Sequence, residues 1–263
     1  HVVATPLFLL AVALVLTILR RGLEGIMPSP AQSLSFGWMM GLGLMMNSWD
    51  LAIIGLLAVL VALVLLLARP PIVSSDTAAT LTLAARADNL GAAAVFAACA
   101  AALTAAPFLA SFRPFANGVL PVAFRTPLWQ LLVIYAHVLP ALAMVPVLML
   151  RQPQRLPVLP IAVLAATGAI LVAIPEIIFL KDIYGADHAR ANTMFKLTFR
   201  AQGLLVLAAC AVLAPALARR GVWTGLALAA MVPLGLTLAY LPHVYAPPSV
   251  IRTPQWVRQP SAA

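Results

Sequence analysis

The sequence predicts an all-α, polytopic integral membrane protein, a helical bundle with about eight transmembrane helices. Only 9% of its 263 residues are charged, whereas a soluble domain carries roughly 25%. A helix needs about 20 apolar residues to cross the hydrocarbon core of a bilayer, and runs of that length recur along the whole chain. These runs are rich in Ala, Leu and Val and lack the alternating pattern of barrel strands. A soluble domain with a single membrane anchor is therefore excluded.

The predicted spans divide the chain into a transmembrane domain, residues 1–245, and a short extramembrane tail, residues 246–263. A break at residues 47–50 separates the second and third spans, because one continuous helix would hold the charged Asp50 at mid-membrane at a cost of roughly 3 kcal/mol. The eight predicted spans cover residues 2–19, 31–47, 51–68, 90–110, 128–150, 157–180, 193–218 and 222–242.

The first apolar run, residues 2–19, has no basic segment before it and no small-residue cleavage site after it, so it does not match a signal peptide. Because the sequence begins with His1 rather than Met, we expect either a processed chain or the ordered part of a longer protein.

The net charge of +9 is distributed as single or paired basic residues between apolar runs. This pattern is typical of topology signals and of anchors for lipid phosphates, so no nucleic-acid partner is predicted. Short loops with paired arginines, such as Arg20 with Arg21, are predicted to be cytoplasmic in the plasma membrane. Residues 47–50, 111–126 and 181–192 would then all lie on the extracytoplasmic face, where a site could form.

Polar residues are densest between Glu176 and Arg200. Lys196 and Arg200 are four residues apart and share one helix face, so they could bind a phosphate or pair with acidic residues of a neighbouring helix. The alternative is an ion-paired hairpin in which Glu176 or Asp182 pairs with Lys196 or Arg190. The candidate binding residues of this stretch are Glu176, Asp182, Arg190, Asn192, Lys196 and Arg200.

Asn192 or Thr193 is expected to cap the helix that begins here. A second polar group contains Asn47, Trp49 and Asp50. An interfacial tryptophan followed by an acidic residue that caps the next helix explains it structurally. Its functional interpretation is a binding site with the Asp50 carboxylate at the mouth of a cavity.

A third group combines Arg113 and Arg125 with phenylalanines such as Phe108, Phe112 and Phe115. Aromatic residues beside arginine at the end of a span are typical of a membrane-interface belt. A binding function would instead place either arginine against a phosphate and the phenylalanines against a lipid chain.

Few other residues indicate bound cofactors. Cys99 and Cys210 fall inside apolar runs and are predicted to be small packing residues. His137 in the fifth span could ligate a haem, but no second histidine follows at metal-ligand spacing. Glycine loops for phosphate, metalloprotease helices and nucleophile elbows are also missing from the sequence. The sequence predicts no metal site, and the cofactor is unknown.

At these residues the sequence resembles the YYY membrane proteins, a family of uncharacterised archaeal and Chloroflexi-type integral membrane proteins. The likeness covers about residues 35–245, and Ala191 replaces the family's usual Met. Family members are much longer, so the chain looks like their C-terminal half. The matching positions are residues 47–50, Pro107, Phe108, Arg125, Thr126, Pro127, Glu176, Phe179, Asp182, Arg190, Asn192, Thr193, Phe195 and Lys196.

That family is similar in layout to the multispanning glycosyltransferases that use polyprenyl-phosphate sugars. The resemblance implies a scaffold with an acceptor or lipid-phosphate site at the extracytoplasmic face more than a complete active centre, and possible partners are membrane lipids and a polyprenyl-phosphate sugar. In an enzyme, Asp50 would supply the carboxylate and Arg190, Lys196 and Arg200 would stabilise the phosphate. The alternative is a non-catalytic scaffold that binds other membrane subunits or the rest of a longer protein, and a transporter is a third interpretation.

Overall fold

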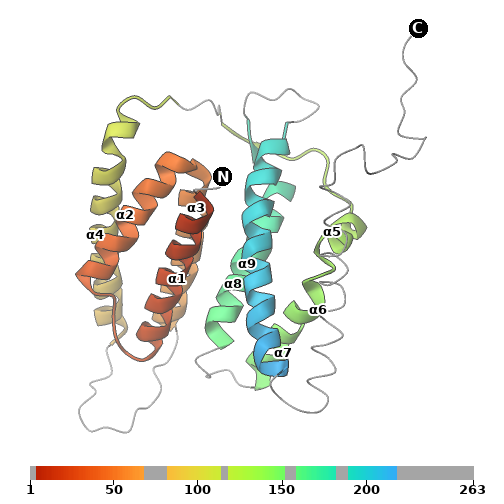
Figure 1. Cartoon of the computed structure of the whole chain (residues 1–263), viewed down its shortest axis with the longest axis horizontal. Coiled ribbons are helices and arrows are strands. Elements are labelled where there is room, and N and C mark those ends of the chain that lie inside the picture. The colour runs from red at the N-terminus through yellow and green to blue at the C-terminus, as the bar shows by residue number, and fades with distance from the viewer. Residues whose placement is uncertain (1–3, 68–81, 114–117, 152–157, 182–188, 218–263) are drawn as a thin grey trace.

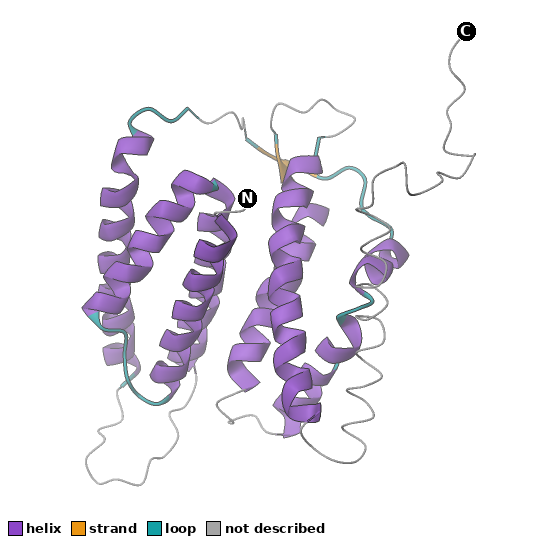
Figure 2. Ribbon diagram, viewed as in Figure 1, coloured by secondary structure: helices purple, strands orange, loops and turns teal. Residues whose placement is uncertain are grey.

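The computed structural model of the chain describes residues 4–67, 82–113, 118–151, 158–181 and 189–217. Nearly all of this structure is helical, which confirms the predicted all-α class (Figures 1 and 2). The helices form two groups that lie side by side. The first group is α1 (Ala4–Leu23), α2 (Pro30–Met46), α3 (Ser48–Leu67) and α4 (Leu83–Leu109), and the second is α5 (Leu128–Tyr135), α6 (Leu139–Leu142), α7 (Met144–Arg151), α8 (Val158–Ala173) and α9 (Ala191–Leu217).

Five described helices are long and apolar enough to cross a membrane: α1, α3, α4, α8 with its 3-10 extension η1 (Ile174–Glu176), and α9. The bent pair of α5 with α6 and α7 would be a sixth. At 17 residues, α2 is only roughly 26 Å long by its rise per residue, which is less than the hydrocarbon core. The structure therefore does not confirm the predicted count of eight. The predicted eighth span, 222–242, and the tail lie outside the described residues.

The boundary between α2 and α3 is sharp. α2 begins with a capping box, in which the Ser29 hydroxyl accepts a hydrogen bond from the Gln32 N–H and the Gln32 side chain accepts one from the Ser29 N–H. It ends at Met46, and Asn47 alone separates it from α3. The predicted break between the second and third spans is confirmed, and Asp50 lies in the first turn of α3.

The predicted fifth span, 128–150, is wrong as a continuous helix. Its two parts are bent by 91° between Tyr135 and Leu139. Pro140 explains the break, because it has no N–H to bond the carbonyl of Ala136 and its ring would clash there. The sixth span is likewise shorter than predicted. It ends at Glu176, and β2 (Ile178–Leu180) follows and pairs antiparallel with β1 (Val119–Pro121).

The core lies where the two groups meet. On α3 the buried residues Ile53, Leu57, Val61 and Leu65 recur every four residues and form one face. This face contacts α1 within its own group and α8 and α9 across the boundary. α9 also contributes a face of small and branched residues to this core, and it packs chiefly against α8. The buried members on α9 are Leu197, Ala201, Leu204, Ala208 and Val212.

α2 and α4 pack closely through two glycines. A Cβ atom at Gly37 would lie 2.1 Å from the carbonyl oxygen of Ala97, and one at Gly41 would lie 2.6 Å from Cβ of Thr104. Both distances are shorter than any non-bonded contact allows, so no larger residue fits without moving a helix. Small residues four apart are a usual way for membrane helices to approach, because lipid provides no hydrophobic drive for association.

Candidate functional site

The three polar stretches predicted to converge do so at one end of the molecule. The α2–α3 turn, the end of α4 and the start of α9 together line a pocket of about 420 Å³. Figure 1 shows these segments at the end of the bundle that also carries the two strands. The pocket lining includes Asn47, Ser48, Trp49, Phe108, Phe112, Asn192 and Lys196, with Leu44, Met45 and Met46 completing it.

The pocket has an aromatic wall and a cationic wall. Phe108 and Phe112 stack with ring centroids 4.7 Å apart, and Trp49 lies on the same pocket. Lys196 is the single charged residue among the described lining residues, and its Nζ lies 5.8 Å from the centroid of the Phe195 ring. Such a pocket combines a positive point charge and amide groups with flat apolar surfaces.

Asp50 follows the lining residue Trp49 and forms a bidentate ion pair with Arg200. The Arg200 Nε donates to Oδ1 at 2.8 Å and Nη2 donates to Oδ2 at 2.7 Å. The side chains are only 4% and 2% exposed for Arg200 and Asp50. The predicted position of Asp50 at the mouth of a cavity is therefore wrong, because the carboxylate is buried against arginine. A catalytic role for Asp50 stays a prediction and would require this pair to open.

Further contacts hold Asp50 and Arg200 from both sides. The Asn47 side-chain amide donates to Asp50 Oδ1 at 3.0 Å. Nη1 of Arg200 donates to the hydroxyl of Thr5 on α1 at 3.1 Å. The guanidinium carbon lies 4.5 Å from the centroid of the Phe8 ring, which is a cation–π contact. Residues of α1, α3 and α9 thus meet at one guanidinium.

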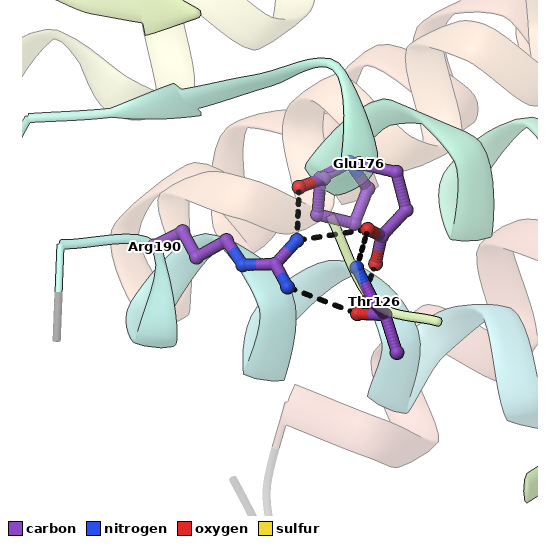
Figure 3. Close-up of polar contacts among 4 residues, drawn as sticks. Thr126, Glu176 and Arg190 are labelled. Atoms are coloured by element: carbon purple, nitrogen blue, oxygen red, sulfur yellow. Dashed lines mark hydrogen bonds and ion pairs between the residues drawn. The ribbon is translucent and has the colours of Figure 1, made fainter. Parts of the chain in front are cut away.

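A second polar cluster joins Thr126, Glu176 and Arg190 (Figure 3). The Thr126 N–H and hydroxyl both donate to the Glu176 carboxylate at 2.7 Å. Arg190 Nη1 donates to the same carboxylate at 2.9 Å and to the carbonyl of Pro175 at 3.3 Å. Arg190 Nη2 donates to the Thr126 hydroxyl at 2.9 Å. The predicted ion-paired hairpin is confirmed for Glu176 with Arg190.

The remaining candidates are more dispersed. Arg113 and Arg125 are exposed and do not line the pocket. Asp182 lies outside the described part of the chain, so its pairing stays a prediction, as does an acidic partner for Lys196. Capping by Asn192 or Thr193 is wrong, because α9 begins at Ala191 and both residues lie in its first turn.

Several contacts were missed by sequence reasoning. The Thr193 hydroxyl accepts a hydrogen bond from the Leu180 N–H at 3.0 Å, and so ties α9 to β2. His137 contacts the side-chain amide of Gln202 at the bend of the fifth span. A threonine or glutamine within an apolar run carries little signal alone, since its hydroxyl or amide usually bonds within its own helix.

Comparison with known proteins indicates the family of the chain. The model of an uncharacterized membrane protein family, DUF2298, matches residues 1–155 and 136–205. No curated protein and no solved structure matches the chain. Together the two matched segments extend over most of the sequence and include every described residue that lines the pocket. The chain therefore belongs to the DUF2298 family of uncharacterized membrane proteins.

Proposed function

We propose that the pocket between the α2–α3 turn and the start of α9 binds the phosphate head of a membrane lipid. The resemblance to the YYY membrane proteins implies a polyprenyl-phosphate sugar as that lipid. The arginine-rich short loops favour the opposite face as cytoplasmic, so we assign the pocket to the extracytoplasmic face of the plasma membrane. The pocket lined by Lys196, Asn192 and Trp49 is the single observation that carries the proposal.

The chemistry of the lining supports an anionic, amphiphilic ligand. A lysine ammonium binds phosphate as a point charge, and the amides of Asn47 and Asn192 and the hydroxyl of Ser48 can donate to its oxygens. No acidic residue is among the described lining residues, so an anion meets no like charge there. Phe108, Phe112 and Trp49 offer apolar surface for the part of the ligand that continues into lipid.

Sugar transfer from such a lipid would require a carboxylate as base. In this chain the Asp50 carboxylate is already held by Arg200, and the Glu176 carboxylate is held by Thr126 and Arg190. Because both carboxylates are paired with arginines, neither is placed as a base for sugar transfer. Binding of a lipid phosphate, which needs no base, is therefore the function proposed for this chain. Sugar transfer by a glycosyltransferase-like protein would additionally require one of these ion pairs to open.

The experiment is binding of a short-chain polyprenyl phosphate to the detergent-solubilised full chain, measured by native mass spectrometry. Lys196→Glu should weaken binding at least tenfold, because it places a like charge against the phosphate, whereas Lys196→Arg should retain it. The matched control is Lys181→Glu, since Lys181 is an exposed lysine at the same end but outside the pocket. Its binding should equal that of the unaltered chain.

The uncharged polyprenol separates phosphate recognition from binding of the chain. It should bind the unaltered protein weakly and should not respond to Lys196→Glu. Trp49→Ala should weaken binding of the phosphate, and Trp129→Ala, at a tryptophan 64% exposed on α5, should not. Equal losses in Lys196→Glu and Lys181→Glu, or no loss in either, would contradict the proposal.

The alternative is a non-catalytic scaffold subunit, and the large exposed surface of α4, on which another subunit could pack, supports it. This helix has 27 residues, of which Ala105 is the single buried one. It also carries an exposed cysteine, Cys99. A photo-crosslinker attached to Cys99 in native membranes should capture another membrane subunit if this function is correct. Capture of a subunit together with intact binding in Lys196→Glu would favour the scaffold over the lipid-phosphate site.

A further inference from the structure

We infer that the buried ion pair of Asp50 with Arg200 is the positioning device of the lipid-phosphate pocket, which it holds open at a fixed width without touching the ligand. The inference rests on the proposed function for the nature of the ligand. This positioning role is supported by the places of the two residues in the sequence, by the geometry of their contact and by the helices that they join.

Each member of the pair lies directly behind one wall of the pocket. Asp50 follows Trp49, a lining residue, and its carboxylate accepts a hydrogen bond from the side-chain amide of Asn47, another lining residue. Arg200 is one helical turn beyond Lys196, the cationic lining residue. Any change in the separation of Asp50 and Arg200 therefore moves the α2–α3 turn and the start of α9, which both line the pocket, apart or together.

The contact fixes orientation as well as distance. Two parallel hydrogen bonds of 2.8 Å and 2.7 Å join the guanidinium to both carboxylate oxygens. Such a fork holds the two planes in register, which a single ammonium contact does not do. Apolar faces of membrane helices pack with little directional preference, because lipid is as apolar as they are. α3 packs chiefly on α1 and α9 chiefly on α8, so the ion pair is the directional contact that sets the rotation of α3 relative to α9.

The pair also joins the two groups of helices. Asp50 belongs to α3 of the first group and Arg200 to α9 of the second, and Arg200 contacts Thr5 and Phe8 of α1 as well. The pocket is lined by residues from both groups. A ligand held between them needs both walls at once, so its affinity should depend on the fork and not simply on the charge of Arg200.

The test compares variants that keep charge but change geometry. Arg200→Lys retains the positive charge and loses the fork, so binding of short-chain polyprenyl phosphate should fall at least tenfold. The matched control is Arg20→Lys, the same substitution in an ion pair that is 74% exposed on its arginine side. It should leave binding unchanged. Equal binding in Arg200→Lys and the unaltered chain would overturn the inference.

A second readout needs no ligand. In a background of Cys99→Ser with Cys210→Ser, the rate at which a thiol reagent labels Ser48→Cys reports the opening of the pocket. Arg200→Lys should change this rate at least threefold, whereas Gly168→Ala should not. Gly168 lies on α8, where a Cβ would meet the Leu205 side chain of α9 at 2.6 Å and the Ala201 carbonyl oxygen at 3.3 Å, so this variant perturbs the packing of α9 but keeps both members of the ion pair.

The two readouts separate the two hypotheses. If the unaltered chain fails to bind polyprenyl phosphate but Arg200→Lys still changes labelling, the proposed ligand is wrong and the positioning role stands. If binding is normal and neither readout responds to Arg200→Lys, the ligand is right and the positioning role is wrong. A change of labelling in Gly168→Ala as large as in Arg200→Lys would assign the effect to general loosening and overturn the inference as well.

Discussion

Two arginine–carboxylate pairs lie at the same end of the molecule and differ in what surrounds them. Arg190 with Glu176 is partly exposed, with side-chain exposures of 25% and 12%, and it joins loops around the small sheet. Arg200 with Asp50 is almost fully buried and joins the two groups of helices. An arginine–carboxylate pair thus connects loops near the surface in one region and joins packed helices in the other.

A charged group is costly to disturb where its surroundings are buried. A buried charge that loses its partner faces a low-dielectric interior, whereas a partly exposed one can turn toward water. The exposed pair of Arg20 with Glu24, at 74% and 38% exposure, extends the comparison to a third environment. All three pairs join an arginine to a carboxylate and differ in how deeply they are buried. They can therefore test whether burial determines how much each pair contributes to stability.

The largest effect is expected at the buried pair. Asp50→Ala leaves Arg200 without its carboxylate and should lower the free energy of unfolding by about 3–5 kcal/mol. Titration with SDS in mixed micelles measures this loss. The paired replacement Asp50→Leu with Arg200→Met should recover most of the stability, since an apolar pair of similar volume can substitute for buried charges. A small loss in Asp50→Ala would show that water reaches the pair.

An intermediate effect is expected at the second pair. Glu176→Ala removes three hydrogen bonds to the carboxylate and should lower the free energy of unfolding by about 1.5–3 kcal/mol, the range for bonds to charged groups. It should also speed cleavage by trypsin after Arg125, which is exposed beside Thr126. Glu176→Gln, which keeps an acceptor for Thr126, should lie between. Unchanged cleavage at Arg125 would contradict a role in holding this loop.

The sequence was sufficient to predict which polar stretches meet and a set of alternative ion pairs, among them Glu176 with Arg190, but not which members of that set form. The cost of a mid-membrane Asp50 correctly predicted the break between α2 and α3. Lys196 and Arg200 share one helix face and carry the same charge, so no pattern decides which of them reaches Asp50. The position along α9 decides it: Arg200 meets the buried carboxylate, while Lys196, one turn nearer the start of the helix, lines the pocket.

The spans were less predictable where proline acts within an apolar run. Hydropathy averages over a window and does not register a lost N–H, so residues 128–150 gave an unbroken signal although Pro140 interrupts the helix. The same limit applies at Pro175, where α8 passes into a 3-10 turn and then into β2. Hydrogen bonds such as those from Thr126 to Glu176 connect positions 50 residues apart and leave no local pattern.

The smallest effect is expected at the exposed pair, and it is the sharpest test of burial as the variable. Arg20 Nε and Glu24 Oε1 are 3.4 Å apart, four residues apart in sequence at the end of α1. Water screens both groups, so Glu24→Gln should change the free energy of unfolding by less than about 0.5 kcal/mol. The same SDS titration measures it, with Arg20→Gln as the reciprocal variant. A loss above about 1 kcal/mol in both, close to that of Glu176→Ala, would mean that the loop beyond α1 depends on this pair and that burial does not order the series.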